Sequence, residues 1–178
     1  EIPGNNIIGI SAGYYLPNQD EFKDYYDGSA YAVFGSYDRF ISNYFSLGLE
    51  SGFMKKTGNL LTPSGGKTSV ESEWTLIPVS ASIKINLEIA DDIVGYLGAG
   101  PDYWYCREEI TESTIHPENS EWIGGYHGTI GLRLYSTDER HSGLGLLLEG
   151  SYSVVDRFGA NGIDIGGWFF KAGLFRHF

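Results

Sequence analysis

Residues 167–178 read Gly167-Trp168-Phe169-Phe170-Lys171-Ala172-Gly173-Leu174-Phe175-Arg176-His177-Phe178, and this stretch decides the fold. Counted back from Phe178, every second residue lies on one face, which carries Trp168, Phe170, Ala172, Leu174 and Arg176. The opposite face includes Lys171 and Gly173. A closed sheet with an apolar exterior and a small, polar interior produces such an alternation. We therefore interpret the stretch as the closing strand of a transmembrane β-barrel.

Seven earlier stretches alternate in the same way and are expected to be strands. They are Asn6–Leu16, Ser29–Tyr37, Tyr44–Lys55, Glu73–Leu87, Val94–Cys106, Glu121–Tyr135 and Gly143–Val155, and the last strand is expected to begin near Ile163. Pro101 lies inside one of them, which predicts a bulge or a local break in pairing. The sequence thus predicts an all-β fold, an eight-stranded antiparallel up-and-down transmembrane β-barrel that forms a single domain over residues 1–178.

The connections between the predicted strands alternate in length. The short ones are Asp38–Asn43, Glu88–Ile93 and Ser136–Ser142. The longer ones are Pro17–Gly28, Lys56–Ser72, Arg107–Ser120 and Asp156–Gly162. Because barrels of the bacterial outer membrane have short periplasmic turns and long extracellular loops, this alternation predicts that both termini are periplasmic.

Bulk properties limit the classes of function. The 178-residue chain has a formal net charge of −11, which argues against a nucleic-acid partner. The single cysteine, Cys106, has no partner for an internal disulfide and no partner set for a metal site, so we expect no metal and no cofactor. No apolar run approaches the roughly 18 residues that a spanning helix needs, but a barrel escapes this test because only alternate residues meet lipid.

The direction of the apolar face distinguishes two kinds of barrel. A soluble lipocalin-like barrel that binds small apolar ligands would show the same alternation with its apolar face inward. Here the polar face consists mostly of Gly, Ser, Ala and Thr with isolated charges, whereas a solvated face is normally richer in Lys and Glu. Small residues also suit an eight-stranded interior, which side chains can fill. We therefore expect the apolar face to contact lipid, with the soluble barrel as the alternative.

The isolated charges on the polar face predict a network in the lumen. Lys84, Arg133 and Lys171 all fall on this face, and each would cost about 2–4 kcal/mol near the bilayer midplane if it faced lipid. Glu50 and Glu149 share the face and are natural partners, and His127 lies there too. The simplest interpretation is that the network satisfies a packed interior, and a proton or solute path is the alternative.

The chain resembles the small bacterial outer-membrane β-barrels that include OmpA, OmpX and OmpW. The most specific element is the closing-strand signal, in which Lys171, Gly173 and Phe178 match the polar residue, the glycine and the terminal aromatic residue. Arg176 departs from this signal, since an apolar residue is usual there. Tyr96–Gly100 also looks like a strand segment of this group. The resemblance implies insertion by the barrel assembly machinery into an outer membrane of lipid and lipopolysaccharide.

The leading functional hypothesis is an integral outer-membrane barrel without catalytic activity. It would serve envelope structure, surface interaction or the passage of small hydrophobic molecules. Eight strands leave no wide aqueous channel, so a general porin is not expected. The enzyme alternative is a lipid A-modifying barrel in which His127 acts with Ser151 or Ser153, and nucleophilic catalysis would need the imidazole and the hydroxyl within hydrogen-bond reach.

Two of the predicted loops are acidic and could bind divalent cations or basic envelope proteins. The acidic residues are Asp20, Glu21, Asp24 and Asp27 in Pro17–Gly28, and Glu108, Glu109, Glu112, Glu118 and Glu121 in Arg107–Glu121. A solvated charge run is the simpler explanation, because the residue spacing of an EF-hand calcium loop is absent.

Overall fold

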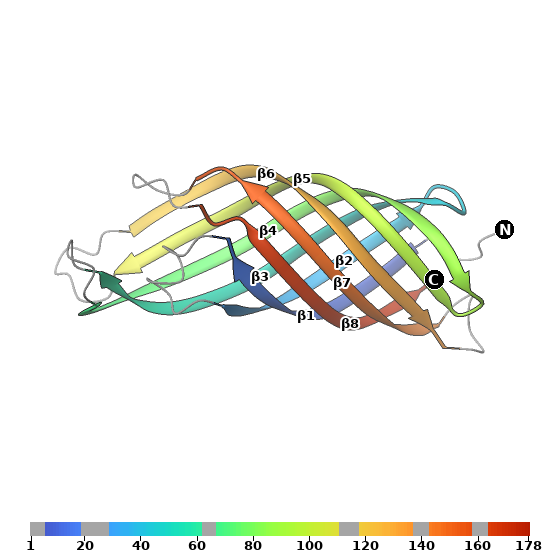
Figure 1. Ribbon diagram of the computed structural model, residues 1–178, viewed down its shortest axis with the longest axis horizontal. Coiled ribbons are helices and arrows are strands. Elements are labelled where there is room, and N and C mark those ends of the chain that lie inside the picture. The colour runs from blue at the N-terminus through green and yellow to red at the C-terminus, as the bar shows by residue number, and fades with distance from the viewer. Residues whose placement is uncertain (1–5, 19–28, 62–66, 111–117, 137–142, 158–163) are drawn as a thin grey trace.

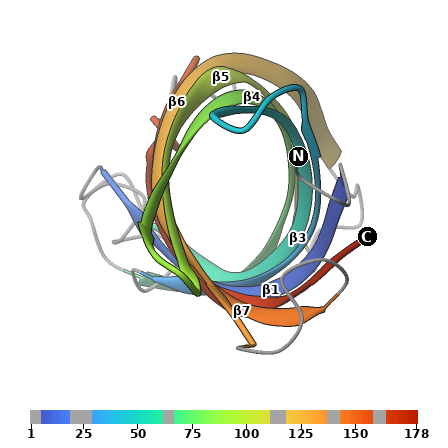
Figure 2. The same cartoon turned by 90° about the vertical axis from the view of Figure 1, so that its right-hand side faces the viewer.

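The structure, a computed structural model, describes residues 6–18, 29–61, 67–110, 118–136, 143–157 and 164–178. Eight antiparallel strands follow one another in chain order around a closed barrel, and β8 pairs with β1 to complete it (Figures 1 and 2). The strands are β1 (Asn6–Pro17), β2 (Ala30–Phe40), β3 (Phe45–Leu61), β4 (Lys67–Ala90), β5 (Ile93–Ile110), β6 (Glu118–Tyr135), β7 (Leu144–Val155) and β8 (Gly167–His177). The predicted eight-stranded antiparallel barrel is therefore confirmed.

Within the described ranges, no helix is long and apolar enough to cross a membrane.

Side chains alternate between the two faces of the barrel wall. On the outside, Ile83, Leu132 and Leu146 are 62%, 38% and 52% exposed. The sequence neighbours Lys84 and Arg133 are only 7% and 1% exposed, because they belong to the inner face. A soluble ligand-binding barrel would place the apolar set inside, so that alternative is wrong for this chain.

The strands fall into two length classes. β1, β2, β7 and β8 have 11 or 12 residues, whereas β3 to β6 have 17 to 24. A tilted strand of about 10 residues is enough to cross the apolar band of an outer membrane, which is about 25 Å tall. The four longer strands therefore continue beyond such a band, mainly at the end of the barrel that lies away from the termini (Figure 1).

Segments that the sequence predicts as loops supply this extra length. The prediction of long loops over Lys56–Ser72 and Arg107–Ser120 is wrong in extent, because 12 of the first 17 residues and 7 of the second 14 residues continue β3 to β6. Thr57, for example, pairs with Glu73 across the β3–β4 hairpin. Beyond the apolar band the outer face of a strand does not have to be apolar, so the periodic signal is weaker there.

Both termini lie at the end of the barrel that carries the short connections (Figure 1). The β2–β3 connection is residues 41–44 and the β4–β5 connection is residues 91–92, so two of the predicted short turns are confirmed. β2 continues past the predicted end at Tyr37 as far as Phe40. As a result Asp38 belongs to a strand and is buried, 4% exposed, in place of the turn position that the sequence predicts.

Pairing between β4 and β5 is interrupted beside Pro101, as the sequence predicts. The ladder runs to Ser80 opposite Asp102 and resumes at Ile83 opposite Ala99, without a change of register. A Cβ atom added to Gly100 would lie only 1.9 Å from the carbonyl oxygen of Ala81. The two strands thus stay in close contact where the hydrogen bonds are missing, and the interruption is not an opening in the wall.

Candidate functional site: the charged lumen

The interior of the barrel has apolar ends and a charged middle. One buried cluster contains Tyr15, Phe34, Trp74, Leu76, Trp104 and Phe169, among others. A second cluster contains Ile7, Phe40, Tyr96, Leu147 and Phe175. On β8, Lys171 lies between members of the two clusters, and on β7 Glu149 does the same. The charged residues are therefore enclosed by apolar side chains toward both ends.

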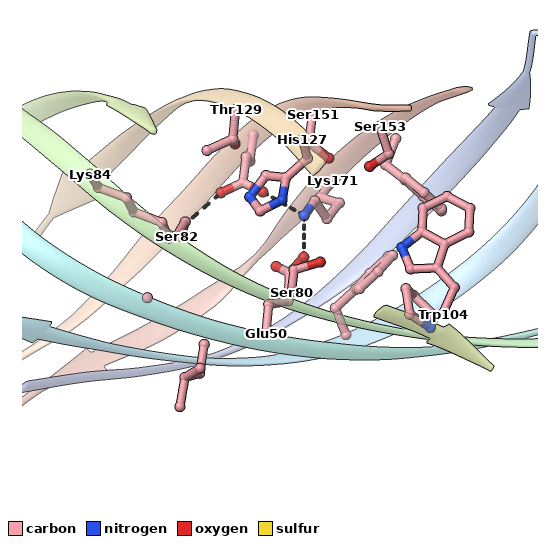
Figure 3. A pocket seen from close by; sticks show the side chains of 16 residues that line it. Glu50, Ser80, Ser82, Lys84, Trp104, His127, Thr129, Ser151, Ser153 and Lys171 are labelled. Atoms are coloured by element: carbon pink, nitrogen blue, oxygen red, sulfur yellow. Dashed lines mark hydrogen bonds and ion pairs between the residues drawn. The ribbon is translucent and has the colours of Figure 1, made fainter. Parts of the chain in front are cut away.

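Lys171 is the centre of the charged network. Its Nζ lies 2.5 Å from Oε1 of Glu50 and 2.5 Å from Oε1 of Glu149, and a dashed line marks its contact with Glu50 in Figure 3. The same Nζ lies 4.8 Å from the centroid of the Phe34 ring, a favourable cation–π geometry. The hydroxyl of Tyr96 donates a 2.5 Å hydrogen bond to Oε2 of Glu149. One ammonium group thus neutralises parts of two carboxylates, the buried one of Glu149 and the half-buried one of Glu50.

Asp38 connects the other two cations. Lys84 Nζ lies 2.8 Å from Oδ1 of Asp38 and 4.0 Å from Oε2 of Glu149. Arg133 donates from Nη2 to Oδ2 of Asp38 at 2.9 Å and from Nη1 to Oδ1 of Asn86 at 2.8 Å. The network therefore combines three cations with three carboxylates, a balanced set that avoids an uncompensated buried charge.

Five of the six residues that the sequence places in the lumen network belong to it: Glu50, Lys84, Arg133, Glu149 and Lys171. Sequence reasoning missed Asp38, because the predicted strand stopped at Tyr37. Continuing the alternation by one residue would have placed Asp38 on the inner face with Ser36. It also missed Asn86 and Tyr96, which lie on the polar face but carry no charge to mark them.

His127 belongs to a separate group and not to the charged network. Its Nδ1 lies 2.8 Å from Oδ1 of Asp102, and Ser80 donates a 2.6 Å hydrogen bond to the same oxygen. His127 is buried in the lumen, and its ion-pair partner is Asp102 on the adjacent strand β5. Among the described residues, no ion pair joins His127 to the five charged residues.

The structure places the three candidate residues of the enzyme alternative on neighbouring strands. Ser153 lies opposite His127 in the β6–β7 register, and Ser151 lies opposite Thr129. Among the residues that the structure describes, no hydrogen bond joins His127 to either serine hydroxyl. His116 lies outside the described ranges.

A small cavity lies between the charged network and the His127 group (Figure 3). Its volume is about 20 Å³, roughly the space of one water molecule, and its lining includes Glu50, Lys84, Trp104, His127 and Lys171. No group of three metal-ligating side chains occurs in the described part of the chain. The apolar clusters lie beyond the charged residues toward both ends of the barrel.

The three residues of the closing-strand signal have different surroundings. Lys171 is inside the network, while Phe178 follows the end of β8 on the outer face and is 50% exposed. Gly173 lies opposite Ser11 on β1, and a Cβ atom added to it would lie 2.1 Å from the carbonyl oxygen of Ile10. Only glycine therefore fits at this point of the β1–β8 closure without a backbone shift.

Some of the acidic residues expected in loops lie in strands, and the others lie outside the described residues. Glu108 and Glu109 lie in β5, and Glu121 lies in β6. Ser72 donates a 3.0 Å hydrogen bond to Glu108, and Arg107 pairs with Glu109. The remaining candidates lie outside the described residues, namely Asp20, Glu21, Asp24, Asp27 and Glu112. Glu118 begins β6, and its side chain is not among those described.

A closed barrel of eight antiparallel strands, apolar outside and charged inside, is the architecture of the small outer-membrane barrels. The chain is similar to the crystal structure of outer membrane protein OprG from Pseudomonas aeruginosa, with a TM-score of 0.71 and 13% identity over 100% of this chain and 97% of that chain. It is also similar to Neisserial surface protein A, with a TM-score of 0.67 and 12% identity over 98% and 97% of the two chains.

A third solved structure, the N-terminal β-barrel domain of OprF from Pseudomonas aeruginosa, has a TM-score of 0.56 and 15% identity, with 98% of each chain covered. No family model matches the sequence, and no curated protein matches it significantly. Likeness at these identities shows a common fold, so the fold that the resemblance implies is confirmed. Activity has to be argued from the molecule itself.

Proposed function

We propose that the protein is an integral outer-membrane barrel with periplasmic termini, and that it is a sealed, non-enzymatic scaffold for contacts at the cell surface. The apolar outer face supports the membrane location. Aromatic side chains near the ends of this face support it as well, because such residues form girdles at the membrane interfaces. Tyr103 stacks on Trp122 with ring centroids 4.9 Å apart toward one end, and Tyr44 is 64% exposed at the other.

The composition of the lumen argues against a pore. A permeating ion or solute would have to break the pairs of Lys171 and Lys84 and also pass two apolar clusters. The alternative is the passage of small hydrophobic molecules through the wall. Pairing is interrupted beside Pro101 and beside Pro78, and the close approach of Gly100 to Ala81 and of Gly52 to Pro78 argues against an opening at either place.

The observation that carries the proposal is the extension of β3 to β6 beyond the shorter strands. The last pair between β2 and β3 is Ala32 with Met54, yet β3 continues to Leu61 while paired with β4. Within the described residues, this part of β3 has no strand on its other side. An unpaired strand edge is a template for an extended segment of another protein, which can add to the sheet through main-chain hydrogen bonds.

Charges at the start of this edge do not block it. Lys55 pairs with Glu73 at 2.7 Å, and Lys56 donates to the carbonyl oxygen of Ser29 at 2.8 Å. Both cations are thus engaged within the protein, and the exposed Thr57 follows them on the open edge.

We further propose that Lys171, Gly173 and Phe178 act as the signal for the barrel assembly machinery. We also propose that the end of the barrel away from the termini contacts lipopolysaccharide.

A photo-crosslinking amino acid tests the surface role. Placed at Thr57 in cells that make the protein, it should give adducts of defined mass with surface or envelope proteins. Placed at Thr75, on the neighbouring strand β4 and near the same end of the barrel, it should give few adducts, because β3 and β5 pair with the two edges of β4. Equal adduct yields at the two positions, or none at Thr57, would contradict strand addition at this edge.

Two further measurements test the sealed barrel and its orientation. In planar bilayers the refolded protein should show no sustained conductance, and a stable open channel would contradict a sealed lumen.

In intact cells an impermeant maleimide should label Thr57→Cys but not Ser42→Cys, since residue 42 lies in a short turn. The native Cys106 is fully buried and should not react. The reverse labelling pattern would overturn the proposed orientation.

A further inference from the structure

The outer face of the barrel carries an elongated pocket over β2 to β5. Its volume is about 400 Å³, which is within the range of small-molecule sites. The outward side chains that line it include Arg39, Leu47, Leu49, Ala81, Ile83 and Ala99. Alanines and the backbone of neighbouring glycines leave a hollow in the wall, while the leucines and Ile83 are the larger residues around it. The outward side chains of the lining are therefore apolar apart from Arg39 and the hydroxyl of Tyr37, which donates a 2.6 Å hydrogen bond to Asn6.

The charged residue of the lining is Arg39, which is the penultimate residue of β2 and is exposed on the outer face. Arg39 lies opposite Asn6 on β1 and opposite Leu47 on β3, and no described residue forms an ion pair with it. The nearby carboxylate of Asp38 belongs to the inner face, where Lys84 and Arg133 occupy it. An unneutralised guanidinium thus sits at the rim of the apolar band.

The pocket runs from this rim into the apolar band. Arg39 is close to the end of β2, whereas Ala99 lies well inside β5, which begins at Ile93. The register connects them in one row across the strands, through Leu47 and Ile83. A ligand that fits this shape is an amphiphile with an anionic head at the membrane surface and a hydrocarbon chain along the wall.

We propose that this pocket binds one acyl chain of an anionic phospholipid whose phosphate pairs with Arg39. The site rests on the proposed membrane location and on the proposed orientation, in which Arg39 faces the periplasmic leaflet. An anionic phospholipid is favoured over a zwitterionic one because the latter carries its own ammonium group near the phosphate. Arg is suited to this role, since its planar guanidinium matches the geometry of a phosphate.

The chain provides a matched control in Arg176. This residue is also an exposed arginine on the outer face at the same end of the barrel, and it lies opposite Ile8 on the other side of β1. It does not line the pocket. If general attraction between basic residues and acidic lipid were sufficient, the two arginines would be equivalent.

Native mass spectrometry of the protein released from nanodiscs of phosphatidylethanolamine and phosphatidylglycerol tests the proposal. The wild type should retain one phosphatidylglycerol in preference, and Arg39→Gln should lower that preference about fivefold, the effect of one basic residue near a membrane surface. Arg176→Gln should retain the wild-type preference. Ala99→Phe, which fills the pocket without changing charge, should reduce retention of the lipid.

Equal retention by the wild type and Arg39→Gln would overturn the lipid site, and so would equal losses in Arg39→Gln and Arg176→Gln. In both cases a barrel that still enters the nanodiscs leaves the proposed membrane location intact. A chain that does not enter bilayers at all would overturn the membrane location and the lipid site together.

Discussion

The inner and outer faces of the barrel wall follow opposite rules, although the same strands carry both. On β4, Lys84 makes two ionic contacts in the lumen, whereas its neighbour Ile83 is 62% exposed on the outside and has no polar group to satisfy. On the inner face, the contribution of a residue to stability depends on its particular ion-pair and hydrogen-bond partners. On the outer face, it depends only on the polarity of the side chain and on its depth in the membrane, so substitutions on the two faces should change stability for different reasons.

The largest expected effect is on the inner face. Lys171→Met should lower the free energy of unfolding by about 3–5 kcal/mol, because it leaves the carboxylates of Glu50 and Glu149 without their shared cation. The measurement is urea unfolding of the refolded protein in lipid vesicles. The triple variant Lys171→Met/Glu50→Gln/Glu149→Gln should recover a large part of the loss. A triple variant as unstable as the single one would show that the cost is not electrostatic.

On the outer face the effect should depend on polarity alone. Ile83→Lys should cost about 2–4 kcal/mol in the same assay, since a charged side chain near the bilayer midplane loses its hydration. Ile83→Ala is the control for lost apolar contact and should cost clearly less. If the two variants were equally stable, the outer face around Ile83 would not be in contact with hydrocarbon.

Two glycines extend the contrast between the inner and outer faces to the backbone. Gly173→Ala on the inner face would bring a Cβ atom to 2.1 Å from the carbonyl of Ile10, so it should cost about 1–3 kcal/mol through displacement of the β1–β8 closure. Gly35, on the outer face of β2, has nothing within 4 Å of an added Cβ. Gly35→Ala should stay within about 0.5 kcal/mol of the wild type. Similar midpoints for both variants would contradict the tight closure.

Among the charged residues, the smallest effect is expected from an ion pair outside the lumen. The side chains of Lys55 and Glu73 are 52% and 30% exposed, although their 2.7 Å separation resembles the contacts of Lys171. Solvent screens such a pair, so Lys55→Met should change the unfolding free energy by no more than about 1 kcal/mol. A cost equal to that of Lys171→Met would mean that burial does not distinguish the two sites.

Sequence reasoning worked where the membrane imposes a rule and failed where it does not. The alternation that lipid demands on one face located all eight strands and placed Lys84, Arg133 and Lys171 inside. Beyond the apolar band that demand ends, so the continuation of β3 to β6 had the composition of loops. For the same reason the buried Asp38 was assigned to a turn, since it lies only two residues before the end of β2.

The sequence by itself determined the face on which each side chain lies, because the pleat of a strand alternates by local geometry and lipid tolerates only one of the two faces. It did not determine which charges meet. Lys171 and Glu50 are 121 residues apart in sequence and come within 2.5 Å only because β8 closes on β1 in one particular register. The enclosure of the network by apolar clusters likewise depends on closure, whereas the pairing of His127 with Asp102 and the pocket beside Arg39 depend on the register of neighbouring strands. Tertiary structure decided them, since each joins residues from different strands.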